Sequence, residues 1–441
     1  MSINMSELNR KDIQQLKASY QKQPAHDVIA RAVQENGINN VARDPKAKTR
    51  MNPVFNVEVK TGKVSNQKRS GRCWLFALLN VLKQKVAKKI GKKDFQLSQN
   101  YLFFWDKIER ANIFYDRMIA LAGRSTKDRT VSFYLGMPGG DGGQWDMAVA
   151  LVQKYGVMPK SAFPEDAVTN NTFEFDMLMN LKLRRDGMQL RRLVRNGATD
   201  SEIMSARQRM LSEVYRITAY SFGLPPKQFD FEYRDDKKKY HLDCGLTPKQ
   251  FYQKYVGMNL DDFVVATNSP DKKMGQKYSL PCEDNVVGGK HIEFLNMPMK
   301  YLKQAAIKQL KAGIPVWFGN DVIQQMSRKH GYLDSHLYRR AQLFNVNLSM
   351  SKADRLRYHE ACVSHAMTLT GVDLVHGKPT KWKVQNSWGS KIGDKGYFVM
   401  TDDWMNQFVY EMVVRKEYLP QAQRKIDQQT SVALQPWDSL Q

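Results

Sequence analysis

The sequence predicts an α+β protein of two lobes with a large helical insertion. In the first half of the chain, apolar residues recur at helical spacing, as in residues 73–90 and 97–123. From Ile314 the pattern changes to short strands, in IPVWFGNDV, HAMTLTGVDL, KWKVQNSW and GYFVMTDD. Helices followed by strands indicate a helical lobe and a β-rich lobe.

The first predicted elements surround a cysteine. Residues 1–50 begin with a polar amphipathic helix, and Val54–Lys60 alternates as a short strand does. A helix is predicted to start at Cys73, because the Ser70-Gly71 pair breaks the chain before it. Gly91 supplies the C-terminal stop of that helix.

Further helices follow up to the middle of the chain. Leu97–Gly123 is a long helical pattern with Ser98 as its N-cap. A glycine-rich loop in Met137–Val149 runs into a short helix that ends at Gly156, and residues 170–262 also follow a helical pattern. The predicted parts are residues 1–165 (N-terminal segment and helical lobe), 166–280 (helical insertion), 281–430 (β-rich lobe) and 431–441 (C-terminal arm).

Composition limits the classes of protein to consider. Four cysteines in 441 residues do not make a disulfide framework, and without a CxxC pair a structural zinc site is not expected. No metal or organic cofactor is expected. No run of eighteen apolar residues occurs, which argues against a transmembrane helix, and no membrane partner is expected. The polar N-terminus does not resemble a secretory signal, so a cytoplasmic location is expected.

Three separate segments of the chain fit nucleophilic catalysis. A thiol nucleophile needs a base and donors for the oxyanion, and the start of a helix favours the thiolate of Cys73. Gln67, on the loop before the helix, could donate to the oxyanion beside the Cys73 N–H. His365 begins an apolar strand and Asn386 follows another, so the asparagine could orient the imidazole. Trp388 could shield their hydrogen bond from water.

Each of these residues has an ordinary structural explanation when it is taken alone. A histidine on an apolar run is usually a hydrogen-bonded core residue, and a cysteine packs as a small hydrophobe. Cysteine, histidine and asparagine in this order, each in a fitting context, are much harder to obtain by chance. The set as a whole therefore predicts a cysteine nucleophile.

The segments QKRSGRCWLFA, SHAMTLTGV and QNSWGSKIGDKGYF resemble the three signature segments of papain-like cysteine peptidases. The resemblance implies that Cys73 is the nucleophile, His365 the acid and base, and Asn386 the residue that orients it. It also implies Gln67 as an oxyanion donor. It further implies that substrate contacts come from the glycine loop, that is, Gly139, Gly140, Asp141, Gly142 and Gly143. The alternative for this loop is a tight turn before a helix.

Within that family the chain resembles the bacterial aminopeptidase C and bleomycin hydrolase branch, over essentially its whole length. The resemblance implies a homohexamer, peptide substrates, and a C-terminus that lies in the cleft and restricts cleavage to N-terminal residues. The arm after Trp437 is a few residues shorter than is usual in the branch. If Gln441 does not reach the substrate's α-ammonium, the alternative is an oligoendopeptidase.

The net charge of +24 permits a function of another class. A basic protein attracts acidic partners, so non-specific nucleic-acid binding is an alternative. No helix-turn-helix, zinc finger or aromatic-basic RNA motif occurs in the sequence. A steep salt dependence without sequence preference would identify such binding as incidental. A basic, solvated surface is the simpler explanation of the charge.

Overall fold

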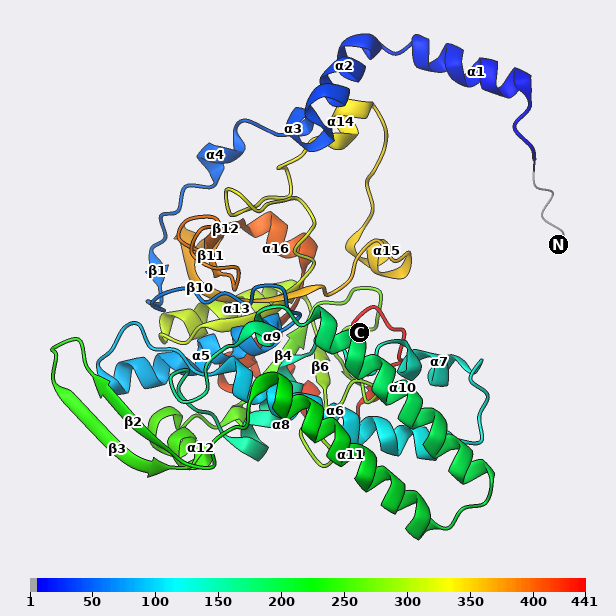
Figure 1. Cartoon of the computed structure of the whole chain (residues 1–441). Helices are drawn as coiled ribbons and strands as arrows, with labels where there is room; N and C mark the ends of the chain where they lie inside the picture. The colour runs from blue at the N-terminus through cyan, green and yellow to red at the C-terminus, as the bar shows by residue number, and fades with distance from the viewer. Residues whose placement is uncertain (1–5) are drawn as a thin grey trace.

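The computed structural model describes residues 6–441. Helices α1 and α2 extend away from the body of the molecule (Figure 1). Asn9 caps the first of them, which corresponds to the predicted N-terminal helix, and any part of that helix before residue 6 lies outside the described residues. The N-terminal helices are α1 (Arg10–Gln21), α2 (His26–Asn36), α3 (Ile38–Ala42) and α4 (Ala47–Arg50).

The helical lobe is arranged around a helix that begins at the predicted cysteine. Gly91 ends this helix in the left-handed conformation with φ of 62°, and Ser98 caps the next helix by accepting the N–H of Tyr101, so both predictions are confirmed. The lobe contains α5 (Cys73–Ile90), α6 (Gln99–Ala120), α7 (Arg129–Gly136), α8 (Trp145–Tyr155), α9 (Ala167–Asn170), α10 (Phe173–Arg195) and α11 (Asp200–Phe222).

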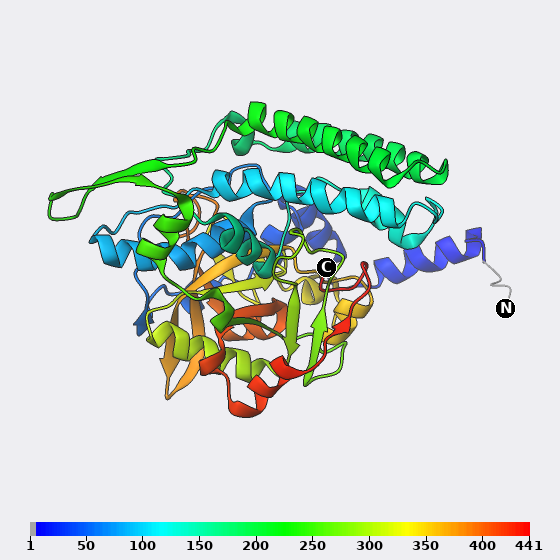
Figure 2. The ribbon, with the colours of Figure 1, turned by 90° about the horizontal axis from the view of Figure 1, so that it is seen from below.

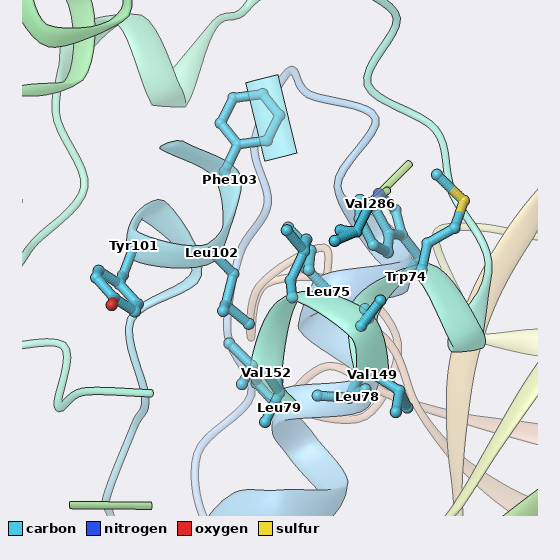
Figure 3. Close-up of a cluster of buried hydrophobic side chains, with 14 of the residues drawn as sticks. Trp74, Leu75, Leu78, Leu79, Tyr101, Leu102, Phe103, Val149, Val152 and Val286 are labelled. Atoms are coloured by element: carbon cyan, nitrogen blue, oxygen red, sulfur yellow. The ribbon is translucent and has the colours of Figure 1, made fainter. Parts of the chain in front are cut away.

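Apolar side chains from α5, α6 and α8 form the core behind the start of α5 (Figure 3). Trp74 and Leu75 directly follow the cysteine and are fully buried. Leu102 of α6 and Val149 of α8 pack in the same cluster. Because protein interiors are close-packed, this core holds the first turn of α5 in a fixed position.

The β-rich lobe is built on one large sheet. Within residues 6–441 the sheet has the order β14-β5-β6-β4-β13-β7-β10-β11-β12-β9-β8, and β1 also pairs with β10. Its strands are β1 (Val57–Glu58), β4 (Phe263–Thr267), β5 (Gln276–Ser279), β6 (Glu293–Asn296), β7 (Val316–Asn320), β8 (Met326–Ser327), β9 (Tyr332–Leu333), β10 (His365–Val375), β11 (Lys378–Gln385), β12 (Tyr397–Thr401), β13 (Val409–Arg415) and β14 (Val432–Ala433).

Helices cover both faces of this sheet. Helix α5 packs on β10 and β7 from the helical lobe, and α13 packs on the opposite face. The indole N–H of Trp317 in β7 donates to the backbone carbonyl of Trp74 at 3.2 Å, which joins the lobes at the start of α5. The remaining helices of this half are α13 (Met299–Lys311), α14 (Arg340–Phe344), α15 (Lys352–Arg357), α16 (Asp402–Phe408) and α17 (Gln421–Arg424).

The insertion differs in part from the prediction. Helices α10 and α11 form an antiparallel pair that lies over α6 (Figure 2). The helical prediction for the rest of residues 170–262 is wrong, because β2 (Phe229–Arg234) and β3 (Tyr240–Leu246) form a hairpin followed by the short helix α12 (Pro248–Phe251). Apart from β1, the first strand of the large sheet along the chain is β4, which begins at Phe263 and lies within the range predicted as the helical insertion. No helix within residues 6–441 has the length and apolarity to cross a membrane.

Candidate active site

Cys73 is the first residue of α5, as the sequence predicts. The preceding residue, Arg72, is fully buried and donates to the backbone carbonyl of Thr169 at 2.6 Å, which fixes the approach to the helix. Gly71 permits a close contact there, since a Cβ at this position would lie 2.7 Å from the Cβ of Asp141. The thiol is therefore held beside the free N–H groups of the first helical turn.

His365 and Asn386 are brought together by adjacent strands. His365 begins β10, and Asn386 follows the end of β11, which pairs with β10. The imidazole Nε2 lies 3.0 Å from Oδ1 of Asn386. The same oxygen accepts the backbone N–H of Ser387 at 2.7 Å, which identifies it as an acceptor. Nε2 of His365 therefore carries the proton, and Nδ1 is the nitrogen left for a reaction.

Trp388 packs against the imidazole of His365. Its ring stacks on the imidazole of His365 with the centroids 5.0 Å apart and an interplanar angle of 28°. The guanidinium of Arg328 lies over the indole ring of Trp388, 4.7 Å from the ring centroid. The stacking gives Trp388 a contact with the base, and its shielding of the His365–Asn386 bond from water stays a prediction.

Gln67 lies on the cavity wall near Cys73. Its Nε2 donates to the backbone carbonyl of Ser70 at 2.6 Å, and its Oε1 accepts the hydroxyl of Ser387. An amide nitrogen carries two hydrogens, so one N–H remains for another acceptor. These contacts fix the orientation of the amide and leave one donor for an oxyanion.

A cavity of about 230 Å³ brings the predicted residues into one place. Its lining combines both lobes: Gln67, Gly71, Cys73, Gly142, Gly143 and Gln144 with Trp317, Gly319, Val363, Ser364, His365 and Ala366. Asn386 and Trp388 lie behind His365 and do not line this cavity. The thiol, the imidazole and a donor of Gln67 therefore face one space.

Some residues of the glycine loop line the cavity at Cys73, and others hold the loop in shape. Gly142 and Gly143 line the cavity at Cys73, whereas Gly140 lines only a neighbouring cavity of about 700 Å³ and Gly139 lines neither. The carboxylate of Asp141 accepts from Nζ of Lys107 at 2.7 Å and from the hydroxyl of Thr172 at 2.6 Å. These internal contacts hold the loop in shape. A direct substrate contact of Asp141 stays a prediction.

The C-terminal arm ends beside this cleft. Leu440 is fully buried, and its carbonyl accepts from the side chain of Gln144 at 3.1 Å. The guanidinium of Arg129 lies 3.8 Å from the ring centroid of Trp437. Gln144 lines both cavities, whereas Gln441 lines only the larger one. The arm therefore reaches the side of the cleft that adjoins the Cys73 cavity.

Burial controls the electrostatics of the reacting pair. Desolvation raises the pKa of the Cys73 thiol, although the N–H groups of Ala366 and of the helix start oppose this. Desolvation also lowers the pKa of His365 to about 4, although the hydrogen bond that the imidazole donates to Asn386 opposes this. Burial therefore disfavours a thiolate at Cys73 alone and an imidazolium at His365 alone. This raised thiol pKa is contrary to the low thiol pKa that the position at the helix start predicted. A thiolate and an imidazolium formed together stabilise each other, so the proton can move between them.

Three residues near the cleft were missed by the sequence reasoning. Lys107 holds the glycine loop, Gln144 holds the arm, and Glu411 of β13 is a fully buried carboxylate. Glu411 had a visible signal, because it is the only charged residue in the apolar run Val409–Val414. Lys107 and Gln144 had no visible signal, because the residues that they contact, Asp141 and Leu440, are distant from them in the sequence. Residues 6–441 contain no group of three or more His, Cys, Asp or Glu side chains that could hold a metal ion.

Comparison with known proteins agrees with this geometry. The model of the Peptidase C1-like family matches residues 7–441. Aminopeptidase E of Lactobacillus helveticus is 50% identical over 98% of this chain and 99% of its own, and aminopeptidase C of the same organism is 44% identical over 98% of each. The crystal structure of PepW from Lactobacillus rhamnosis HN001 superposes with a TM-score of 0.96 at 49% identity, covering 99% of both chains. With the matched family spanning both lobes and the cleft between them, the chain belongs to the Peptidase C1-like family and is a papain-like cysteine peptidase.

Proposed function

We propose that the protein is an aminopeptidase that releases N-terminal residues from peptides through a thioester on Cys73. The observation that carries the proposal is the buried arm, since Leu440 fills space beside the cavity of the thiol. A cleft closed at one end admits the end of a chain more readily than its middle. Relatives named aminopeptidases C, E, G and W support the same activity. The oligoendopeptidase alternative has no comparable support.

The reaction follows from the groups that face the cavity. As Cys73 attacks the scissile carbonyl, its proton passes to Nδ1 of His365. The N–H groups of Cys73 and Gln67 donate to the oxyanion. His365 then protonates the leaving amine, and the acyl group remains on sulfur as a thioester. A water molecule attacks the thioester through a second oxyanion, and the thiol and the imidazole are restored.

A pair of matched decapeptides tests the proposal. One has a free N-terminus and the other an acetylated N-terminus, and mass spectrometry identifies their products. We expect the free peptide to shorten one residue at a time while the acetylated peptide stays intact. The Cys73→Ser protein is the control and should cut neither peptide. Internal cleavage of the acetylated peptide by the full chain would overturn the aminopeptidase proposal.

Assembly and location are further parts of the proposal. We propose a homohexamer, because α1 and α2 contain no buried residue and expose apolar side chains such as Ile13, Leu16 and Val28. A cytoplasmic location is supported by the free thiols of all four cysteines, which fit a reducing compartment. Any nucleic-acid binding is proposed to be non-specific and to follow from the net charge of +24 alone.

A further inference from the structure

Lys107 of α6 is a fully buried lysine that the reaction described above does not use. Its ammonium lies within hydrogen-bond distance of four oxygen atoms. These are the backbone carbonyls of Gly139 and Gly140, at 2.8 and 3.0 Å, and the carboxylates of Asp141 and Asp176, at 2.7 and 3.3 Å. An ammonium has three hydrogens, so the four oxygens cannot each receive one of their own. Asp176 makes the longest contact and therefore competes with the glycine loop for this cation.

Asp141 connects this lysine to the start of α5. Its second carboxylate oxygen accepts the backbone N–H of Gly71 at 3.0 Å and the hydroxyl of Thr172 at 2.6 Å. Its backbone carbonyl accepts the indole N–H of Trp74 at 2.8 Å. Gly71 and Trp74 lie on either side of Cys73 in the chain. The position of Asp141 therefore fixes the glycine loop relative to the nucleophile.

One side of α10 meets this network near the start of the helix. Thr172 precedes α10, and Asp176 and Asn180 follow at intervals of four residues, which places the three side chains on one face. Asn180 accepts the backbone N–H of Gly139 at 2.9 Å. Each of the three therefore contacts either the glycine loop or the lysine that holds it. The insertion is joined to the loop by charged and by uncharged hydrogen bonds.

The site contains two carboxylates and one ammonium. Lys107 of α6 and Asp141 of the glycine loop are the charged groups that act on Asp176, and α11 contributes the uncharged Phe222 beside this end of α10. Burial, together with the neighbouring Asp141, raises the pKa of Asp176 to about 7, although Lys107 opposes this. Against the effect of burial, the Lys107 ammonium holds the pKa of Asp141 well below its usual range. Above neutral pH the site therefore has one more negative charge than its cation balances.

We propose that Asp176 is a positioning residue, through which helix α10 of the insertion sets the position of the glycine loop at the Cys73 cavity. The two glycines that follow Asp141 line that cavity. When Asp176 is neutral, Lys107 is left to the loop and holds it against the start of α5. When Asp176 is ionised, it competes for Lys107 and repels Asp141, so the loop is held less firmly. The proposal rests on the proposed peptidase function and adds to it a proton-dependent affinity for the peptide.

Steady-state kinetics at pH 6 and pH 8, with the decapeptide that has a free N-terminus, test this role. Neutral Asp176 predominates below pH 7 and is lost as the pH rises through that value, so KM of the wild type should rise. Asp176→Asn keeps the size of the side chain and cannot ionise. The substrate's α-ammonium titrates in the same range, so the measured quantity is the difference between the two proteins. We expect the wild-type rise in KM to exceed that of Asp176→Asn by about three- to tenfold, with little change in kcat.

Asp186→Asn is the matched control. Asp186 is a buried carboxylate of the same helix, and it contacts Lys182 and the hydroxyl of Tyr115 rather than the glycine loop. This variant should keep the wild-type pH dependence of KM. Asn180→Ala removes an uncharged contact between α10 and the loop, so it should raise KM by a similar factor at both pH values. It carries the test if Asp176→Asn fails to fold, and an unchanged KM would then overturn the proposal.

Alkylation of Cys73 with iodoacetamide separates a shift of the loop from damage to the nucleophile. The reagent needs no contact with the glycine loop, so its rate should be the same for the wild type and Asp176→Asn at each pH. An equal rise in KM for the two proteins, or an alkylation rate that changes as much as KM does, would overturn the role of Asp176. A wild-type chain that does not cleave the decapeptide would instead contradict the proposed peptidase function, so the two failures are distinguishable.

Discussion

The orientation of His365 depends on the amide oxygen of Asn386. That oxygen accepts from Nε2 of His365 and from the backbone N–H of Ser387, so it cannot rotate without breaking two hydrogen bonds. The sequence predicted this pair because each residue adjoins a recognisable strand. It could not predict the unfavourable desolvation of both reacting charges, since burial of Cys73 and His365 arises only when the lobes meet.

Asn386→Ala should lower kcat less than His365→Ala, because the asparagine orients the imidazole but exchanges no proton. The hydrogen bond that His365 donates to Asn386 raises the pKa of His365, so its loss should lower that pKa. The acidic limb of the kcat/KM profile, expected near pH 4 in the wild type, should then move to lower pH. A shift to higher pH, or a larger loss than with His365→Ala, would count against these roles.

Gln67→Ala should lower kcat by about 10²–10³-fold, the usual effect of removing one oxyanion donor. KM should change little, because the donor acts mainly in the transition state. Ser387→Ala is the matched control, since it removes the hydroxyl that holds Oε1 of Gln67 but leaves the donor in place. It should cost less than Gln67→Ala. An effect of Gln67→Ala on KM alone would show that the residue binds substrate instead.

At the scale of elements, local signals decided which predictions succeeded. The start of α5 and the strands β7, β10, β11 and β12 follow from breaks and apolar patterns in the chain. The hairpin of β2 and β3 was missed although Phe229, Phe231 and Tyr233 alternate with charged residues, because the helical pattern before it was extended too far. Strand β4 was missed because its partners, β6 and β13, follow much later in the sequence.

The C-terminal arm is the element that we expect to set the mode of cleavage. Removing Asp438–Gln441 should slow the release of residues from free-amino substrates and make N-acetylated peptides cleavable, because it empties the space that Leu440 fills. Deleting Gln441 alone is the matched control. It keeps Leu440 and moves the terminal carboxylate by about 3.5 Å, one extended residue. Unchanged selectivity after the longer truncation would show that the arm does not control access.

At the scale of the molecule, the active site exists only where the lobes meet. The helical lobe contributes Cys73 and the β-rich lobe contributes His365, and Trp317 joins them through its hydrogen bond to Trp74. The sequence predicted both lobes and the residues that each contributes. The pairing of Gly319 with Glu411 could not be predicted, because it requires the register between β7 and β13.

The central claim is that one thiol among four performs the reaction. Alkylation with limiting iodoacetamide at pH 6, followed by peptide mapping and an activity assay on the same samples, tests it most directly. Cys282 and Cys362 have a raised thiol pKa through burial, and Cys73 is the one cysteine that lines the cavity of His365. We expect Cys73 to react first and activity to fall in proportion to its modification. Equal labelling of all four cysteines, or activity that survives full modification of Cys73, would contradict the account.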